Sequence, residues 1–240
     1  MLFMKKLFLL LLAAFPAVLF AQDRVIHDPN AEARNVGSFH AIKVSTGIEL
    51  IMKQGSTEAL AVSASDNEAR DKIKTEVVDG VLKIYFDYKL LPKNTFRNKH
   101  LKAYVSFKSI DKFSGASGSS TTVDGSMTIG ALEMSLSSGA YFKGDVKGSG
   151  LTVKQNSGSR LYLSGEAQSL TVDASSGARF FGYDIAAGKV DAGASSGGKV
   201  EVTVTKELIA GASSGGKIEY RGDGVITKVS TGSGGSVRKS

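Results

Sequence analysis

One dipeptide, Ser-Gly, recurs at nearly constant intervals along the second half of this 240-residue chain and limits the folds open to it. The repeat stands at Ser114-Gly115, Ser138-Gly139, Ser157-Gly158, Ser176-Gly177, Ser196-Gly197, Ser214-Gly215 and Ser233-Gly234. Successive steps are 24, 19, 19, 20, 18 and 19 residues. A period near 19 held over this distance is typical of a repeat architecture, in which no unit is stable until it stacks on its neighbours.

Three columns of apolar residues appear when the repeats are aligned on their serine. They are Leu132, Leu151, Leu170, Val190 and Leu208 six places before it; Met134, Val153, Val172, Ala192 and Ala210 four before it; and Phe142, Leu161, Phe180, Val200 and Ile218 four after it. Mostly polar residues separate the columns, and such period-two alternation predicts short β-strands. We expect the pairs Leu151/Leu170 and Val153/Val172 to be stacked neighbours in the core.

Short strands separated by Gly/Ser corners at this period predict a β-solenoid coil of about 19 residues. Glycine adopts positive-φ corner conformations that a Cβ would obstruct, and small neighbours allow coils to stack at about 4.8 Å. The alternative, a disordered Gly/Ser-rich tail, conflicts with the registered apolar columns. The predicted fold is therefore all-β, with the Ser-Gly repeats occupying residues 108–237.

Residues 37–107 carry strand signals of a less regular kind. Apolar residues flank a corner at Thr46-Gly47, which resembles a divergent first coil. Runs 73–78 and 81–86 alternate around Asp79-Gly80, a hairpin signal, and the polar stretch 66–72 fits one helical turn. We expect this region to cap the solenoid within one domain, 37–240; a separate small β domain is the alternative.

The first 21 residues have the pattern of a secretory signal. Lys5 and Lys6 precede an apolar run of about 14 residues, and Ala21 supplies a small residue at the expected cleavage point. The run is short of the ~20 residues that a membrane-spanning helix needs, which makes an anchor the less favoured alternative. We expect export, to the periplasm or the cell surface, with residues 22–36 as an N-terminal tail and no transmembrane segment after cleavage.

The ordered set of these motifs resembles one family. Phe39-x-x-Ile42-x-Val44, the Gln54-Gly55 turn, Asp79-Gly80-x-Leu82-x-Ile84 and the repeated Ser-Gly-Ala are similar to the DUF2807 family of auto-transporter adhesins with a head GIN domain. The resemblance covers about residues 37–222. It implies a right-handed single-stranded β-helix in an exported, non-enzymatic protein. We expect no β-barrel translocator after the repeats, which departs from what the family's label implies.

Composition excludes several chemistries. The chain has no Cys, which rules out a disulfide scaffold, a thiol nucleophile and Cys-based metal sites. Its three histidines, His27, His40 and His100, all precede the repeats, so a Ser-His-Asp triad within the repeats is excluded. No Gly-rich loop stands between a strand and a helix. We therefore expect no cofactor and no metal.

Carboxylates are the remaining catalytic candidates, because β-helix proteins include polysaccharide lyases and hydrolases. An acidic residue follows five of the Ser-Gly corners: Asp124, Asp145, Glu166, Asp184 and Asp223. Their offsets from the serine are 10, 7, 9, 8 and 9 residues, whereas a catalytic or calcium-binding column should keep its register. We interpret them as turn carboxylates and keep a carbohydrate-active enzyme as the alternative.

Basic residues give two candidate binding features. The position three after the repeat serine is Arg160, Arg179, Lys199 and Lys217 in four consecutive coils. Glu201 and Glu219 share the face of the two lysines and can neutralise them, whereas Tyr162 and Phe181 stand beside the arginines. Arginine beside exposed aromatics suits contact with a glycan or an anion; plain stacking on the protein surface is the alternative.

The second feature is a basic segment between Asp87 and Asp111, which contains no acidic residue. It contains Lys89, Lys93, Arg97, Lys99, His100 and Lys102, with Phe96 near the expected loop tip. Solvated charge explains such a loop as well as anion binding does.

From these features we predict a non-catalytic exported binding or adhesion module that contacts an anionic glycan or cell-surface polymer. The candidate ligand-binding residues are Lys93, Arg97, Lys99, Lys102, Arg160 and Arg179. Nucleic acid is a poor partner for an exported protein. A β-helix carbohydrate-active enzyme and a purely structural envelope protein are the alternatives.

Overall fold

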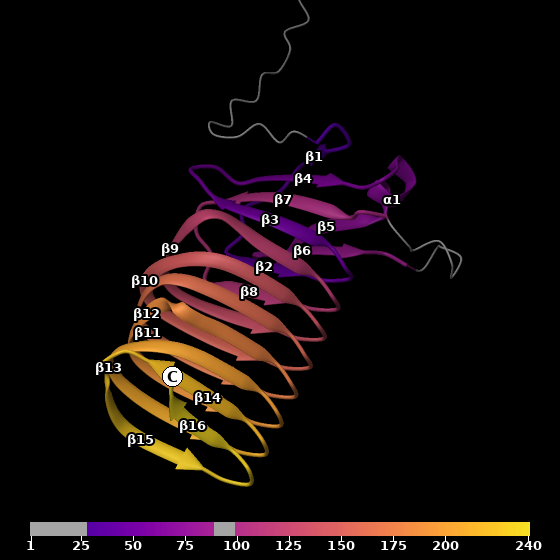
Figure 1. Ribbon diagram of the computed structural model, residues 1–240. Helices are drawn as coiled ribbons and strands as arrows, with labels where there is room; N and C mark the ends of the chain where they lie inside the picture. Colours follow the sequence, from indigo (N-terminus) through magenta and orange to yellow (C-terminus); the bar gives the residue numbers. More distant parts are fainter. Residues whose placement is uncertain (1–27, 89–98) are drawn as a thin grey trace, which may run out of the picture.

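The chain forms a β-solenoid of about seven turns, whose coils lie roughly 19 residues apart (Figure 1). The computed structural model describes residues 28–88 and 99–240. Five long strands wrap from one face of the solenoid to the other: β9 Ser120–Leu136, β10 Tyr141–Gln155, β11 Arg160–Ala174, β12 Arg179–Ala194 and β13 Lys199–Ala212. They pair in parallel, each with the next, as the repeat predicted.

Tight turns join one coil to the next, and seven Ser-Gly pairs form them. The serines have φ between 44° and 52° and the glycines between 69° and 76°. Two successive residues with positive φ make a type I′ turn, and the N–H of Ala178, for example, closes it by donating to the Ser175 carbonyl at 3.0 Å. The turns also stack: each of the first six glycines donates its N–H to the serine carbonyl of the following turn, at 3.0–3.2 Å.

One corner differs from its predicted position. Ser114 and Gly115 lie in strand β8, Lys112–Gly115, and the turn is formed by Ser117-Gly118 instead. Gly115 is aligned with Leu136 of β9 and occupies a buried strand position, so it cannot serve as a corner. With this correction the first step of the repeat shortens from 24 to 21 residues.

The apolar columns form the core between the two faces. Leu151 is in register with Leu170 and Val153 with Val172, which confirms the predicted stacking. All four are 2% exposed or less. On the opposite wall the column Phe142, Leu161, Phe180, Val200 and Ile218 is equally buried.

The N-terminal strands extend the same two faces and then cover their edge (Figure 1). β2 Ala41–Val44 and β3 Glu49–Gln54 form a coil around Thr46-Gly47, and Gly47 donates its N–H to the Ser117 carbonyl, as in the later turns. The elements beyond this coil are β1 Glu32–Arg34, β4 Ala59–Ser63, α1 Asn67–Asp71, β5 Ile73–Val78, β6 Val81–Phe86 and β7 Lys102–Phe107.

β6 and β7 still pair in parallel with β2 and β3 of the first coil, and antiparallel pairing begins beyond them. β4 runs antiparallel to β7 and β1 antiparallel to β4, while β5 and β6 form the predicted hairpin around Asp79-Gly80. Strand β1 lies in the segment that the sequence assigned to the N-terminal tail. The predicted helical turn is α1, which Asp66 caps by accepting a hydrogen bond from the Ala69 N–H.

The C-terminal end carries no such cover (Figure 1). Its outermost strands are β15 Val225–Thr231 and β16 Ser236–Lys239, which follow β14 Lys217–Arg221. Ile226 and Val229 continue two core columns, in register with Leu208 and Ala210, yet each is 46% exposed. The charged side chains Lys228, Arg238 and Lys239 stand on these edge strands, a common protection against edge-to-edge association.

In the part of the chain that the structure describes, no helix has the length and apolar character that crossing a membrane requires.

The middle and the C-terminal end of one core column give a test of coil stacking. Leu170→Ala should lower the free energy of unfolding by about 2–5 kcal/mol, because a buried leucine is lost between two coils. Ile226→Ala, in the same column but half-exposed on the last coil, should cost less than about 1 kcal/mol. Urea denaturation followed by circular dichroism measures both; equal losses would contradict the stacking of the column.

Candidate functional site

The outer surface of one solenoid face carries three neighbouring columns of side chains on strands β10–β14. We call this surface the binding face. Register places Tyr141, Arg160, Arg179, Lys199 and Lys217 in the first column, and Lys143, Tyr162, Phe181, Glu201 and Glu219 in the second. Asp145, Ser164 and Asp184 form the third. Side chains two residues apart on a strand share a face, so the columns lie about 7 Å from one another.

Arg160 and Arg179 are direct neighbours in adjacent strands, at the strand spacing of about 4.8 Å. Both side chains are exposed. Within the described residues, neither guanidinium has a hydrogen bond, an ion pair or an aromatic ring beneath it. The alternative in which the two arginines cover Tyr162 and Phe181 therefore has no contact to support it.

Aromatic rings stack along the second column, parallel to the solenoid axis. The Tyr162 and Phe181 ring centroids are 4.3 Å apart with planes 10° from parallel, and Tyr141 leans on Tyr162 at 5.5 Å. Because the two rings cover each other's faces, the pair presents ring edges to solvent.

A hollow of about 500 Å³ lies beside the aromatic pair. Its charged lining consists of Lys143, Asp145, Asp184 and Glu201, and Tyr183 and Ser164 contribute hydroxyl groups. Ser164 donates a hydrogen bond to Asp145 at 2.8 Å. Hydrogen bonds from Ser126 and Ser164 lower the pKa of Asp145, so this carboxylate is ionised at neutral pH.

The sequence concealed this hollow because β12 contains extra residues. Tyr162 pairs with Phe181 but Ser164 pairs with Asp184, so one more residue separates the positions on β12 than on β11. This β-bulge explains why the offset is 8 at Asp184 and 7 at Asp145, and it brings Asp184 into the column of Asp145. Tyr141, Lys143 and Tyr183, which the sequence did not single out, also belong to the binding face.

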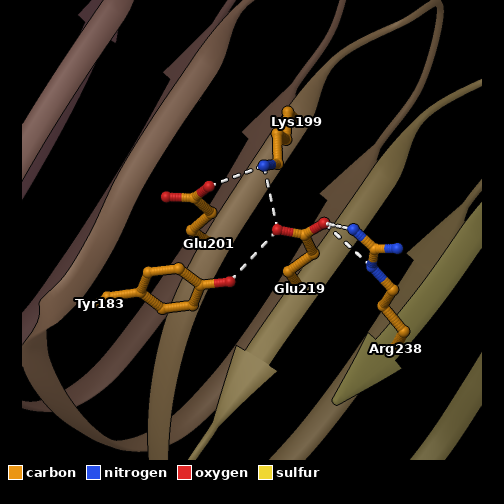
Figure 2. A network of polar contacts seen from close by, with 5 residues as sticks. All are labelled: Tyr183, Lys199, Glu201, Glu219 and Arg238. Atoms are coloured by element: carbon orange, nitrogen blue, oxygen red, sulfur yellow. Dashed lines mark hydrogen bonds and ion pairs between the residues drawn. The ribbon is translucent and has the colours of Figure 1, made fainter. Parts of the chain in front are cut away.

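Beyond the hollow, a polar network ties the last coils together (Figure 2). Lys199 Nζ lies 2.7 Å from Glu201 Oε1 and 2.9 Å from Glu219 Oε2. The Tyr183 hydroxyl donates to Glu219 Oε2 at 3.2 Å, and Arg238 donates from Nε to Glu219 Oε1 at 2.9 Å and also from Nη2. The network thus joins β12, β13, β14 and β16.

Glu219 is the centre of this network. Its side chain is 9% exposed, and hydrogen bonds from Lys199 and then Arg238 lower its pKa to about 2. Glu201 in turn raises the pKa of Lys199 through its hydrogen bond. The prediction that the two glutamates neutralise the lysines is confirmed for Lys199; Glu219 pairs with Lys199 and Arg238 rather than with Lys217.

The described residues of the basic segment, Lys99, His100 and Lys102, lie toward the N-terminal end of the solenoid. Lys93 and Arg97 are outside the described residues. Lys99 Nζ lies 2.8 Å from Asp66, and Lys102 Nζ lies 3.9 Å from Glu49, so acidic residues from other segments reach both lysines. Strands β3, β9 and β10 separate Lys102 from Arg160, which places the two candidate groups about 19 Å apart.

A second hollow, of about 460 Å³, lies over β9–β11 on the opposite face. Its lining includes Ala131, Gly150, Thr152 and Ser169 but no aromatic side chain. Among residues 28–88 and 99–240, no group of three histidine or acidic side chains is placed to bind a metal ion.

Comparison with known families agrees with this architecture. The family model DUF2807, described as "Putative auto-transporter adhesin, head GIN domain", matches residues 38–224, and the chain belongs to this family. No curated protein sequence matches the chain.

Solved structures share the fold at low identity. A putative adhesin from Bacteroides fragilis has a TM-score of 0.79 and 18% identity, over 88% of this chain and 96% of that one. A putative lipid binding protein from Parabacteroides distasonis has a TM-score of 0.67 and 22% identity, over 89% and 98%. A putative adhesin from Parabacteroides merdae has a TM-score of 0.61 and 16% identity, over 88% and 95%.

The buried network predicts an acid-sensitive contribution to stability. Glu219→Gln should lower the free energy of unfolding by about 2 kcal/mol at pH 7, because charge-assisted hydrogen bonds are lost. The folded pKa of about 2 lies below the ordinary 4.5, so the wild-type advantage is complete above pH 4.5 and is lost as pH falls toward 2.

Melting temperatures of both proteins between pH 7 and pH 2 measure this effect. Glu207→Gln is the matched control, since Glu207 pairs with Lys189 at 3.3 Å on the exposed surface and should contribute less than about 1 kcal/mol. A difference between wild type and Glu219→Gln that does not shrink in acid would contradict the assigned pKa.

Proposed function

We propose that this protein is an exported, non-catalytic adhesion module whose binding face holds an anionic glycan or another anionic cell-surface polymer against Arg160 and Arg179. Membership of the adhesin family supports an adhesion-like role. The signal pattern of residues 1–21, which lie outside the described residues, supports export to the periplasm or the cell surface. Nucleic acid is disfavoured as a partner for the same reason.

The observation that carries the proposal is the unpaired arginine pair. Like charges side by side on neighbouring strands are destabilising. One coil further on, Lys199 stands in the same column and has two glutamates as partners. Arg160 and Arg179 have no such partner within the described chain, and an anionic ligand would supply it.

The segment before β7 is a second, weaker candidate. Lys99 and Lys102 already have acidic neighbours, and the Lys99 ammonium lowers the pKa of Asp66, the residue that caps α1. We therefore assign any contribution of this segment to Lys93 and Arg97 and place the main contact at the arginine pair.

A carbohydrate-active enzyme is the alternative, because the hollow brings carboxylates near cationic side chains. A glycosidase needs a carboxylic acid with a raised pKa as its proton donor. Hydrogen bonds lower the pKa of Asp145, and both oxygens of Glu219 have partners. These environments favour a binding function over proton transfer; a purely structural envelope protein would leave the arginine pair without a role.

Removing the arginine pair should separate binding from stability. Arg160→Gln/Arg179→Gln should weaken retention on columns of immobilised polygalacturonate or dextran sulfate. The melting temperature should stay level or rise slightly, because exposed charges contribute little and a like-charge contact is removed. Retention of the wild type should fall with salt, since about 0.1 M salt screens exposed charges beyond about 10 Å.

Two matched variants complete this test. Lys154→Gln/Lys228→Gln removes the same charge from the opposite face and should leave retention unchanged. Lys93→Gln/Arg97→Gln measures the segment before β7. Equal losses in all three double variants would show a general charge effect and overturn the assignment of the site.

Turnover decides between the adhesin and the enzyme. Incubation with a panel of polysaccharides should release no reducing ends and no unsaturated products above a buffer control. Product formation that Asp145→Asn abolishes would establish the enzyme instead.

A further inference from the structure

We infer that the ligand residue held on the binding face is a carboxylated, hydroxyl-rich sugar of the uronic-acid type rather than a sulfated one. This inference rests on the proposed function and specifies its ligand. It follows from the change of charge across the face, from the arginine pair through the aromatic pair to the hollow.

The hollow is suited to hydroxyl donors. Its volume of about 500 Å³ falls within the range of about 300–1,000 Å³ that is usual for small-molecule sites. Three of its four charged lining residues are carboxylates: Asp145, Asp184 and Glu201. An ionised carboxylate only accepts hydrogen bonds, at about four positions, so each of these groups can receive sugar hydroxyls in addition to its protein partners.

Asp184 is the most available of these acceptors. Its side chain is exposed, and within the described residues it has no hydrogen bond or ion pair. Asp145 is held by Ser164 and stays ionised because its pKa is lowered. Two negative charges therefore stand two columns, or about 13 Å along the strands, from the arginine column, on the far side of the aromatic edges.

This arrangement discriminates between anionic polymers. A uronic-acid residue carries one negative charge, so its carboxylate can lie on Arg160 and Arg179 while its hydroxyls face the hollow. Arginine binds a carboxylate through two parallel hydrogen bonds. A ring whose hydroxyls are sulfated would instead direct negative charge at Asp145 and Asp184, where like charges repel.

Binding of two probes of equal length tests the inference: oligogalacturonate, with one carboxylate per sugar, and a dextran sulfate oligosaccharide. Calorimetry on the full chain at 0.15 M salt should show tighter binding of oligogalacturonate. Asp184→Asn should weaken oligogalacturonate by about tenfold, through loss of charge-assisted hydrogen bonds, and should strengthen dextran sulfate. Asp191→Asn, an equal charge change at an exposed position on the opposite face, should alter neither.

The outcomes separate this inference from the proposal beneath it. If Asp184→Asn strengthens both probes, or if the wild type prefers dextran sulfate, the hollow only repels anions and the inference is wrong while the adhesin proposal stands. If Arg160→Gln/Arg179→Gln leaves the binding of both probes unchanged, both the proposed function and this inference are wrong. The double variant Asp145→Asn/Asp184→Asn should bind oligogalacturonate more weakly, and dextran sulfate more tightly, than Asp184→Asn alone. A melting temperature close to that of wild type shows that this variant is folded.

Discussion

The hydrogen bond between successive Ser-Gly turns is the interaction on which the rest of this structure depends. Each turn places two residues in the left-handed region, which is unfavourable for serine, and the glycine N–H then finds its acceptor only in the next turn. One hydrogen bond closes each turn within its own coil, but the N–H of the turn glycine is satisfied only by the neighbouring coil. The same contact fixes where each coil starts relative to the last, so that Leu151 meets Leu170 and Arg160 meets Arg179.

Fixed register makes every position along the coil a column, and a column has opposite consequences inside and outside. Inside, apolar residues such as Val153 and Val172 gain a neighbour of their own kind on both sides. Outside, equal charges are brought together, and the like-charged side chains have two kinds of neighbours. At Lys199 it supplies Glu201 and Glu219, whereas at Arg160 and Arg179 it supplies only aromatic neighbours.

The sequence could predict those features that depend on the repeating local pattern. Period and alternation were enough for the coils, the core columns, the Thr46-Gly47 corner and the hairpin at Asp79-Gly80, because each depends on a local pattern that repeats. The Ser114-Gly115 corner was misplaced because two Ser-Gly pairs stand one residue apart and only burial distinguishes them. Strand β1 was not recognised because its three residues pair with β4, a partner about 28 residues away in sequence.

The hollow shows why the site itself was the least predictable part. A sequence alignment on the Ser-Gly turns assumes equal coil lengths, and the extra residues of β12 break that assumption between Phe181 and Ala186. The same insertion carries Tyr183 and Asp184 to the lining of the hollow and lets the Tyr183 hydroxyl reach Glu219, two coils further on. Bulges commonly redirect side chains in this way. At this hollow the lining residues Tyr183 and Asp184 come from a departure from the repeat, and that departure is also what hides the hollow from an analysis based on period.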